Sequence, residues 1–215
     1  CGDGSWYAGA DTYRDWAENQ PWCKRKIAER SIPHWMRDVN VYLNYSAGDK
    51  RFSSVDGGLK TLDAYSDYLG LPIVAVPFGW ERYGSWIGPE YFPPRPSAGF
   101  YRELSARLRE NGDHMLLYLS GFRWGVRKVK STNPRRYTDY DGTEEFERRG
   151  RTAAVVGPDD RISVRERPWA DNYELCPGSD VACDILGACY DRIYEWGVSG
   201  VDFDQNCGGD APPCY

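Results

Sequence analysis

Hydrophobic and polar positions follow one another in blocks that predict strands and helices in turn. Four apolar blocks have the length and composition of strands, and the last three each follow a glycine that closes a helical block. The second, residues 71–78, is almost continuously apolar, as expected for a parallel strand covered on both faces. The predicted strands run from Val39 to Tyr45, Ile73 to Phe78, Met115 to Leu119 and Val201 to Asp204.

Helical periodicity separates these strands. Apolar residues recur every three to four positions in residues 59–69, 99–111 and 181–196, and Ser179 is a suitable N-cap for the last of these helices. Trp6 to Gln20 is a further predicted amphipathic helix, ahead of the first strand. Three helical crossovers that join four parallel strands in sequential order predict an α/β fold, a partial (β/α)8 TIM barrel.

The same pattern predicts how the chain is organised. Residues 1–37 hold the N-terminal helix and lead-in, and residues 38–215 hold the first half of the barrel. A charged region after the third strand, about residues 127–175, is an insertion in which residues 152–156 and 161–164 predict a hairpin. A complete barrel typically needs about 250 residues. We therefore expect the chain to be a fragment whose partner is the remainder of a parent barrel.

The residues predicted to be buried are Leu43, Val74, Val76, Leu117, Leu119, Val201 and Phe203.

Composition and charge narrow the range of partners. The net charge is −5, with acids and bases interspersed, which argues against nucleic acid and anionic membrane surfaces. No run of 18 apolar residues predicts a membrane span. Aromatic residues make up 15% of the chain, and many of them fall near predicted strand ends, where aromatic faces stack on sugar rings. More than half of these aromatic residues must belong to the core. Their position near strand ends is therefore supporting evidence for a carbohydrate partner and does not establish one.

The cysteines and glycines favour neither a metal nor a cofactor. Seven Cys, five of them in the last forty residues, form no paired C-x-x-C motif, and there are only two His. No GxGxxG follows the first strand, so the dinucleotide-binding fingerprint is missing. The odd number of cysteines is compatible with a secreted or cell-envelope location without requiring one. Cys1 and Gly2 fit the start of a mature lipoprotein, but a fragment of a longer protein is the simpler interpretation.

The end of the fourth predicted strand carries the most distinctive chemistry. Residues 197–207 end an apolar run with acids, and period-two alternation places Val201 and Phe203 on one face and Asp202 and Asp204 on the other. Carboxylates at the C-terminal end of a barrel strand lie where such folds build their active sites. Asp204 and Asp202 are therefore the predicted catalytic residues.

Two other interpretations of these acids stay open. In the first, the acids simply accept backbone hydrogen bonds at a solvated strand end. Alternatively, Asp202, Asp204 and Asn206 have the spacing of the start of a calcium loop, although Cys207 stands where that loop needs Gly and Pro213 where it needs a bidentate Glu. We predict no metal here.

Residues after the other strands complete the predicted substrate site. Trp80 and Glu81 follow the second strand, Arg123 and Trp124 follow the third, and Asn206 follows the fourth. The tryptophan rings would stack on sugars, while the polar groups would bind hydroxyl groups. The alternatives are core packing for the tryptophans, a loop cap for Arg123 and a surface ion pair for Glu81.

Several short motifs, taken in order, resemble a bacterial (β/α)8 family described mainly as a domain of unknown function. That family is similar to endo-α-N-acetylgalactosaminidases and, more distantly, to the α-galactosidase and α-glucosidase clan. The motifs span nearly the whole chain and lie at Trp6 to Tyr7, Tyr13 to Ala17, Gln20 to Cys23, Tyr91 to Pro94, Cys176 to Pro177 and Gly200 to Gln205.

This resemblance implies a retaining glycoside hydrolase in which Asp204 is the nucleophile. Asp202 falls where members of the clan often carry an apolar or aromatic residue. The acid/base of such enzymes comes from a later strand, so we expect it beyond residue 215 and expect the fragment alone to be inactive.

Two functions from other classes remain as alternatives. A non-catalytic carbohydrate-binding barrel would keep Trp80 and Trp124 as sugar platforms. A metal-dependent glycosyltransferase would use residues 202–204 as its Asp-x-Asp motif, although no strand-Gly-helix signal indicates a nucleotide-binding half.

Overall fold

The computed structural model describes residues 4–38, 40–83, 88–119, 121–126, 140–166 and 171–204, which belong to two compact units, Cys1–Val39 and Asn40–Tyr215. The first unit holds helix α1 (Trp6–Glu18), which confirms the predicted N-terminal helix, and the short 3-10 turns η1 (Pro21–Cys23), η2 (Ile27–Glu29) and η3 (His34–Arg37). The side chain of Ser5 caps α1 by accepting the N–H of Ala8. No residue of α1 is buried.

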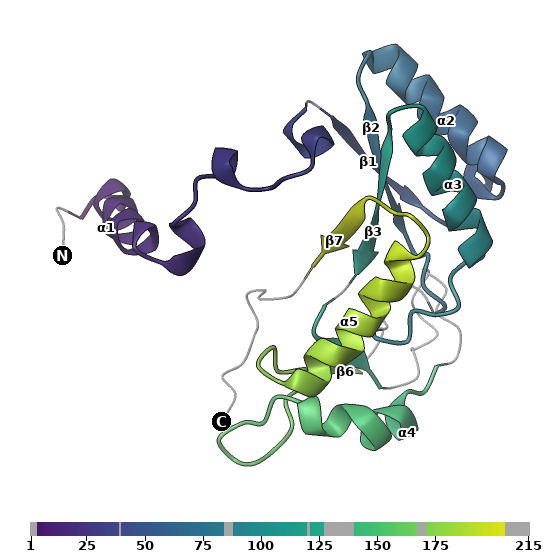
Figure 1. The fold of residues 1–215 in the computed structure, drawn as a ribbon. Helices are drawn as coiled ribbons and strands as arrows, with labels where there is room; N and C mark the ends of the chain where they lie inside the picture. Colours follow the sequence, from purple (N-terminus) through teal and green to yellow (C-terminus); the bar gives the residue numbers. More distant parts are fainter. Residues whose placement is uncertain are drawn as a thin grey trace. The chain divides into compact units, whose positions relative to one another are not determined.

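The second unit is built on a four-stranded parallel sheet (Figure 1). Its strands β1 (Val41–Ser46), β2 (Ile73–Phe78), β3 (His114–Leu119) and β7 (Gly200–Phe203) lie side by side in that order. All three pairings are parallel. Helices α2 (Val55–Leu69), α3 (Ala98–Glu110) and α5 (Asp180–Tyr194) lie between successive strands along the chain. The predicted α/β partial barrel with strands in sequential order is thus confirmed.

Serine caps fix where the crossover helices begin. Ser54, Ser97 and Ser179 each accept a backbone N–H three residues further on. Helix α2 therefore starts at residue 55, four residues before the predicted start at residue 59. The predicted start was wrong because it placed Gly58 before the helix. Gly58 lies inside the helix and packs closely there, since an added Cβ would lie 3.1 Å from a ring carbon of Phe52.

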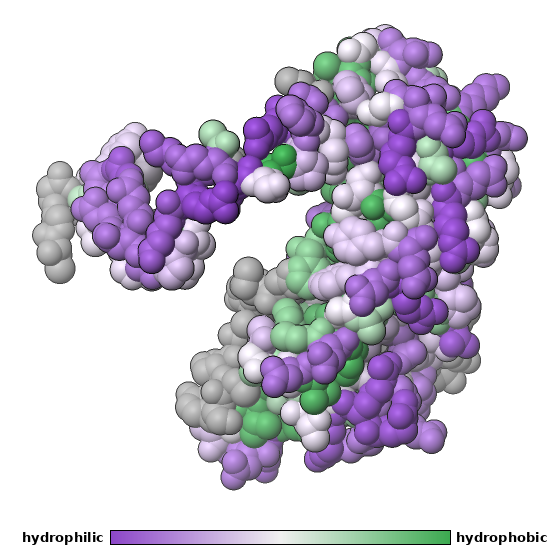
Figure 2. Space-filling view, in the orientation of Figure 1, coloured by the Kyte–Doolittle hydropathy of each residue, from purple (hydrophilic) through white to green (hydrophobic). Residues whose placement is uncertain are grey.

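Alternation along the strands gives the sheet two different faces. The face toward the helices supplies Ile73, Ala75, Met115, Leu117 and Leu119 to a core that also contains Leu62, Tyr101, Leu104, Leu108 and Ile193. We call the opposite side the inner face; it carries the alternate residues of each strand. Over α2 and α3, the outer surface is mainly hydrophilic (Figure 2), as expected for amphipathic helices. None of the described helices is long and apolar enough to cross a membrane.

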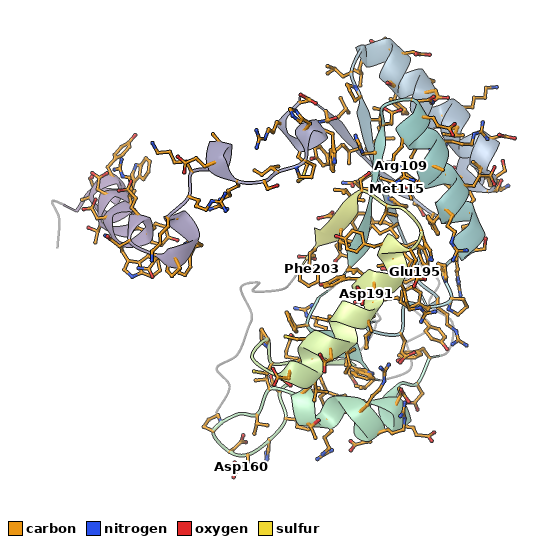
Figure 3. All side chains as sticks on the ribbon, in the orientation of Figure 1. Arg109, Met115, Asp160, Asp191, Glu195 and Phe203 are labelled. Carbon is orange, nitrogen blue, oxygen red and sulfur yellow. The ribbon has the colours of Figure 1, made fainter. Side chains whose placement is uncertain are left out.

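The burial predictions hold for the two central strands and fail at the two edges. Val74, Val76, Leu117 and Leu119 are buried, as predicted. Leu43, Val201 and Phe203 are only half-buried, because in the described part of the chain β1 and β7 each have a neighbouring strand on one side only. Phe203 still packs beside α5 (Figure 3), with its ring centroid 5.3 Å from that of Tyr190.

A small antiparallel sheet forms after β3. It contains β4 (Arg123–Gly125), β5 (Val164–Glu166) and β6 (Asp171–Glu174) in the order β4-β6-β5. Helix α4 (Thr143–Glu145), the π-helical turn η5 (Phe146–Gly150) and the 3-10 turn η6 (Arg151–Ala153) precede β5. The predicted hairpin is found in part. Val156 bridges Ile162, and on either side of this bridge the N–H of Gly157 donates to the carbonyl of Arg161 and the N–H of Ser163 donates to the carbonyl of Val155, both at 2.8 Å. The first predicted residues turn into η6 instead of extending.

Two contacts tie the small antiparallel sheet and the η5 turn beside it to the loop that follows β2. The N–H of Gly125 donates to the carbonyl of Gly88 at 2.8 Å, and Arg149 of η5 pairs with Glu90 at 3.0 Å. The small antiparallel sheet and η5 are therefore attached to the same unit as the parallel sheet.

Gly150 lies where η5 passes directly against Trp124. A Cβ at this position would lie 2.5 Å from Cε3 of Trp124 and 2.8 Å from Cδ2 of Phe146. Because Trp124 is fully buried, it has no room to move aside. We expect Gly150→Ala to lower the free energy of unfolding by about 1–3 kcal/mol.

A matched glycine provides the control for this substitution. In α5, nothing lies within 4 Å of a Cβ added at Gly187, so Gly187→Ala should stabilise the protein by about 0.5–1 kcal/mol through helix propensity. Urea unfolding of both variants tests the contrast. A Gly150→Ala protein as stable as the unsubstituted chain would contradict the packing described.

Candidate active site

The two predicted catalytic acids lie on the inner face at the carboxyl end of β7. Val201 and Phe203 pack toward the helices, and Asp202 and Asp204 alternate with them and are exposed. The alternation predicted for the fourth strand is therefore confirmed. In parallel strands of this kind, the carboxyl end is where polar groups meet a ligand.

Two consecutive residues of β3 hold Asp204. Its backbone N–H donates to the carbonyl of Leu119 at 3.0 Å, and its Oδ2 accepts a hydrogen bond from the hydroxyl of Tyr118 at 2.7 Å. Sequence reasoning missed Tyr118. The signal was its inner-face position on the third strand, in register with Asp202 of the neighbouring β7.

Tyr118 is itself held firmly. Only 4% of the residue is exposed, and its ring stacks on Phe78 with centroids 4.5 Å apart. Its backbone carbonyl accepts the indole N–H of Trp80 at 2.9 Å. The hydroxyl that meets Asp204 is therefore presented by a side chain with little freedom to move.

The pKa of the Asp202 carboxyl depends partly on Asp204, two residues further along the chain. Partial burial, followed by the negative charge of Asp204, raises the pKa of the Asp202 carboxyl. Asp202 therefore keeps a proton more readily than an isolated aspartate does. Protonated, it can donate a hydrogen bond; ionised, it can only accept one.

The prediction that Trp80 stacks on a sugar is wrong. The side chain has no exposed surface, and its ring packs among Tyr91, Tyr101 and Trp196 with centroids 5.8 to 6.4 Å away. A ring enclosed on every side has no face to offer to a ligand. Trp80 is a core residue that braces β3 through its indole N–H.

Glu81 is also buried, so the prediction that it contacts substrate is wrong, and it forms no surface ion pair either. Neither carboxyl oxygen has a hydrogen-bond partner of normal geometry within the described part of the chain. Burial raises the pKa of Glu81 to about 8, although the backbone N–H groups of Gly79 and Glu81 offset part of this effect. The carboxyl is therefore neutral over most of the physiological pH range.

Arg123 and Trp124 belong to the small antiparallel sheet. Nε of Arg123 lies 3.4 Å from Oε1 of Glu174, and both side chains are largely buried, so contact with a sugar would require this pair to break. Trp124 has no exposed surface and packs against Phe146, with Arg149 over its ring at 5.0 Å. The prediction of Trp124 as a sugar platform is therefore wrong for the same reason as for Trp80.

The remaining predicted residue, Asn206, lies outside the described residues. Within the described ranges, no group of three or more His, Cys, Asp or Glu side chains is placed to hold a metal ion. The site that the described residues do bring together consists of Asp202, Asp204, Tyr118 and Phe78, drawn from three neighbouring strands.

Four parallel strands in sequential order, joined by helical crossovers, define part of a TIM-barrel-like (β/α) fold, and comparison with known proteins agrees. The chain belongs to the family DUF6259, described as a domain of unknown function, whose profile matches residues 1–215. A protein of Bacteroides thetaiotaomicron named "Putative glycoside hydrolase" is 24% identical over 213 residues, which cover 97% of this chain and 28% of that protein.

Solved structures show the same fold. The ligand-free α-N-acetylgalactosaminidase NagBb of Bifidobacterium bifidum matches with a TM-score of 0.67 at 14% identity, over 97% of this chain and 36% of that one. A maltogenic α-amylase of Thermotoga neapolitana matches with a TM-score of 0.53 at 10% identity, over 80% of this chain and 40% of that one. The chain thus spans between about a quarter and two fifths of the length of these proteins. The family resemblance and the TIM-barrel-like fold expected from the sequence are confirmed.

Proposed function

We propose that this chain forms part of the catalytic domain of a retaining glycoside hydrolase and that Asp204 is its nucleophile. The observation that carries the proposal is the position of Asp204 at the carboxyl end of β7, on the inner face, with its carboxylate held by Tyr118. The relative named as a glycoside hydrolase and the glycosidase folds above support this proposal.

The chemistry has two steps. The Asp204 carboxylate attacks the anomeric carbon while the glycosidic C–O bond breaks and an acid protonates the departing oxygen. The same acid, now a base, then takes a proton from water, which attacks the anomeric carbon and displaces the Asp204 carboxylate. The sugar leaves with the configuration it had in the substrate.

Asp202 does not suit the role of this acid/base. In retaining enzymes the two carboxyl groups flank the sugar about 5–5.5 Å apart. Two residues along one strand are roughly 6.6 Å apart at the backbone, and both side chains approach from the same side. We assign the acid/base to the remainder of a longer protein, and we assign Asp202 a hydrogen bond to a sugar hydroxyl group.

The substrate class to test first is an α-linked N-acetylgalactosaminide, because the α-N-acetylgalactosaminidase fold covers nearly the whole chain. The burial of Trp80 and Trp124 removes the sugar platforms on which the alternative of a non-catalytic carbohydrate-binding barrel depended. No described feature favours that alternative over hydrolysis.

The test is hydrolysis by the full-length natural polypeptide. We expect it to cleave p-nitrophenyl α-N-acetylgalactosaminide or another p-nitrophenyl α-glycoside, and proton NMR should detect the α-anomer as the first product. A β-anomer formed first would mean inversion and would remove the nucleophile role from Asp204. Binding without turnover would instead favour the carbohydrate-binding alternative, and a requirement for Mn²⁺ and a nucleotide sugar would favour the glycosyltransferase.

A further inference from the structure

The geometry assigns Tyr118 a positioning role: its hydroxyl fixes Oδ2 of Asp204, so that Oδ1 is the oxygen presented to the anomeric carbon. This inference rests on the proposed function, because it concerns the nucleophile of that reaction. It adds a residue of β3 that the family motifs in the sequence do not include.

Asp204 is restrained at its backbone and at one oxygen of its carboxylate. Its backbone N–H is bonded to Leu119, and its Oδ2 is bonded to Tyr118, the preceding residue of the same strand. With the backbone and one carboxylate oxygen fixed, rotation about both side-chain torsions of Asp204 is restricted. The other oxygen, Oδ1, then has a defined direction.

The hydrogen bond itself is of the strong kind. A hydroxyl that donates to an ionised carboxylate forms a charge-assisted bond, about 2.5–2.7 Å long, that is roughly twice as strong as a neutral one. The observed separation of 2.7 Å lies at the end of that range. Tyr118 thus holds an anionic oxygen without supplying a second negative charge.

Tyr118 can impose this geometry because its own position is fixed from two directions. The ring stacks on Phe78 of β2, and the backbone carbonyl accepts the indole N–H of Trp80. A run of contacts therefore leads from the aromatic core through Trp80 and Tyr118 to Asp204. Catalytic groups that are already in position when the substrate binds need no rearrangement during the reaction. Misplacement of such a group by about 1 Å can lower the rate about 100-fold.

The test is Tyr118→Phe in the full-length natural polypeptide, assayed with p-nitrophenyl α-N-acetylgalactosaminide. Phenylalanine keeps the ring and its stacking on Phe78 and removes only the hydroxyl. We expect kcat and kcat/KM to fall together by about 10- to 100-fold, with KM changed less than about threefold, because the lost interaction orients the attacking group without binding substrate.

The matched control is Tyr45→Phe. Tyr45 is also a buried tyrosine at the end of a strand, but it faces the helices, stacks on Phe52 and has a hydroxyl without a hydrogen-bond partner among the described residues. It should leave kcat unchanged. Trp80→Phe is a second variant, which removes the donor to the Tyr118 carbonyl together with part of a buried ring, and it should lower kcat by less than Tyr118→Phe does.

The outcomes separate the positioning role from the proposed function. Unchanged kcat in Tyr118→Phe, with Asp204→Asn inactive, would reject the positioning role and leave Asp204 as nucleophile. A loss in Tyr118→Phe as large as in Asp204→Asn would also reject it and would indicate that the tyrosine oxygen itself attacks, as tyrosine does in some glycosidases. A rise in KM with kcat unchanged would make Tyr118 a substrate-binding residue. Full activity of Asp204→Asn, or no turnover of any p-nitrophenyl α-glycoside by the unsubstituted protein, would reject both proposals.

Discussion

Asp204→Asn should lower kcat for glycoside hydrolysis by several orders of magnitude in the full-length natural polypeptide, while the fold stays intact. An amide keeps the shape of the carboxylate but does not attack an anomeric carbon, so no glycosyl-enzyme bond forms. The amide oxygen still accepts the hydrogen bond from Tyr118, so the packing of β3 against β7 is retained. Turnover of p-nitrophenyl α-N-acetylgalactosaminide and the free energy of unfolding, measured on the same preparation, check both parts.

Asp202→Asn is the matched comparison, since it makes the same chemical change two residues away on the same face. We expect a smaller loss of kcat, because the role assigned to Asp202 is a hydrogen bond to a sugar hydroxyl group, which an amide can also form. If Asp202→Asn were the inactive variant and Asp204→Asn were active, the nucleophile would be Asp202. If neither changed turnover, both acids would be structural and the catalytic assignment would be abandoned.

The parallel sheet was predictable because its signals are local. Strands such as residues 71–78 are continuously apolar, and the glycines that close the helices give clear boundaries. Gly197, with a φ of 72°, is a case in which the backbone requires glycine at the end of a helix. The small antiparallel sheet was missed because β4 and β6 are three and four residues long and nearly fifty residues apart, which leaves no periodicity to detect.

The candidate site was only partly predictable. The orientation of Asp202 and Asp204 follows from alternation within one strand. The contact between Asp204 and Tyr118 depends on the register between two strands that are more than eighty residues apart. The tryptophan predictions failed because a position after a strand end does not determine whether the ring turns toward the sugar or into the core, where Trp80 and Trp124 both lie.

The other large effect that we expect is a dependence of the free energy of unfolding on pH, caused by Glu81. Its carboxyl has no exposed surface, and its pKa is raised by burial from an ordinary 4.5 to about 8. Between these two values the folded protein holds a proton that the unfolded chain has lost. The contribution of this group to stability is therefore fully present below about pH 4.5 and is lost as the pH rises to about 8, at about 1.4 kcal/mol for each pH unit.

Glu81→Gln should remove this dependence, because glutamine is neutral at every pH. At pH 5 the variant and the unsubstituted protein should have similar free energies of unfolding, and at pH 8 the variant should be more stable by roughly 2–5 kcal/mol. Urea unfolding at the two pH values measures the difference. Glu103→Gln is the control, since Glu103 is an exposed residue of α3, and it should leave the pH dependence unchanged. If the free energy of unfolding changed equally with pH in the Glu81→Gln protein and the unsubstituted protein, the Glu81 carboxyl would be ionised in the folded state. It would then be reached by water or by a cation.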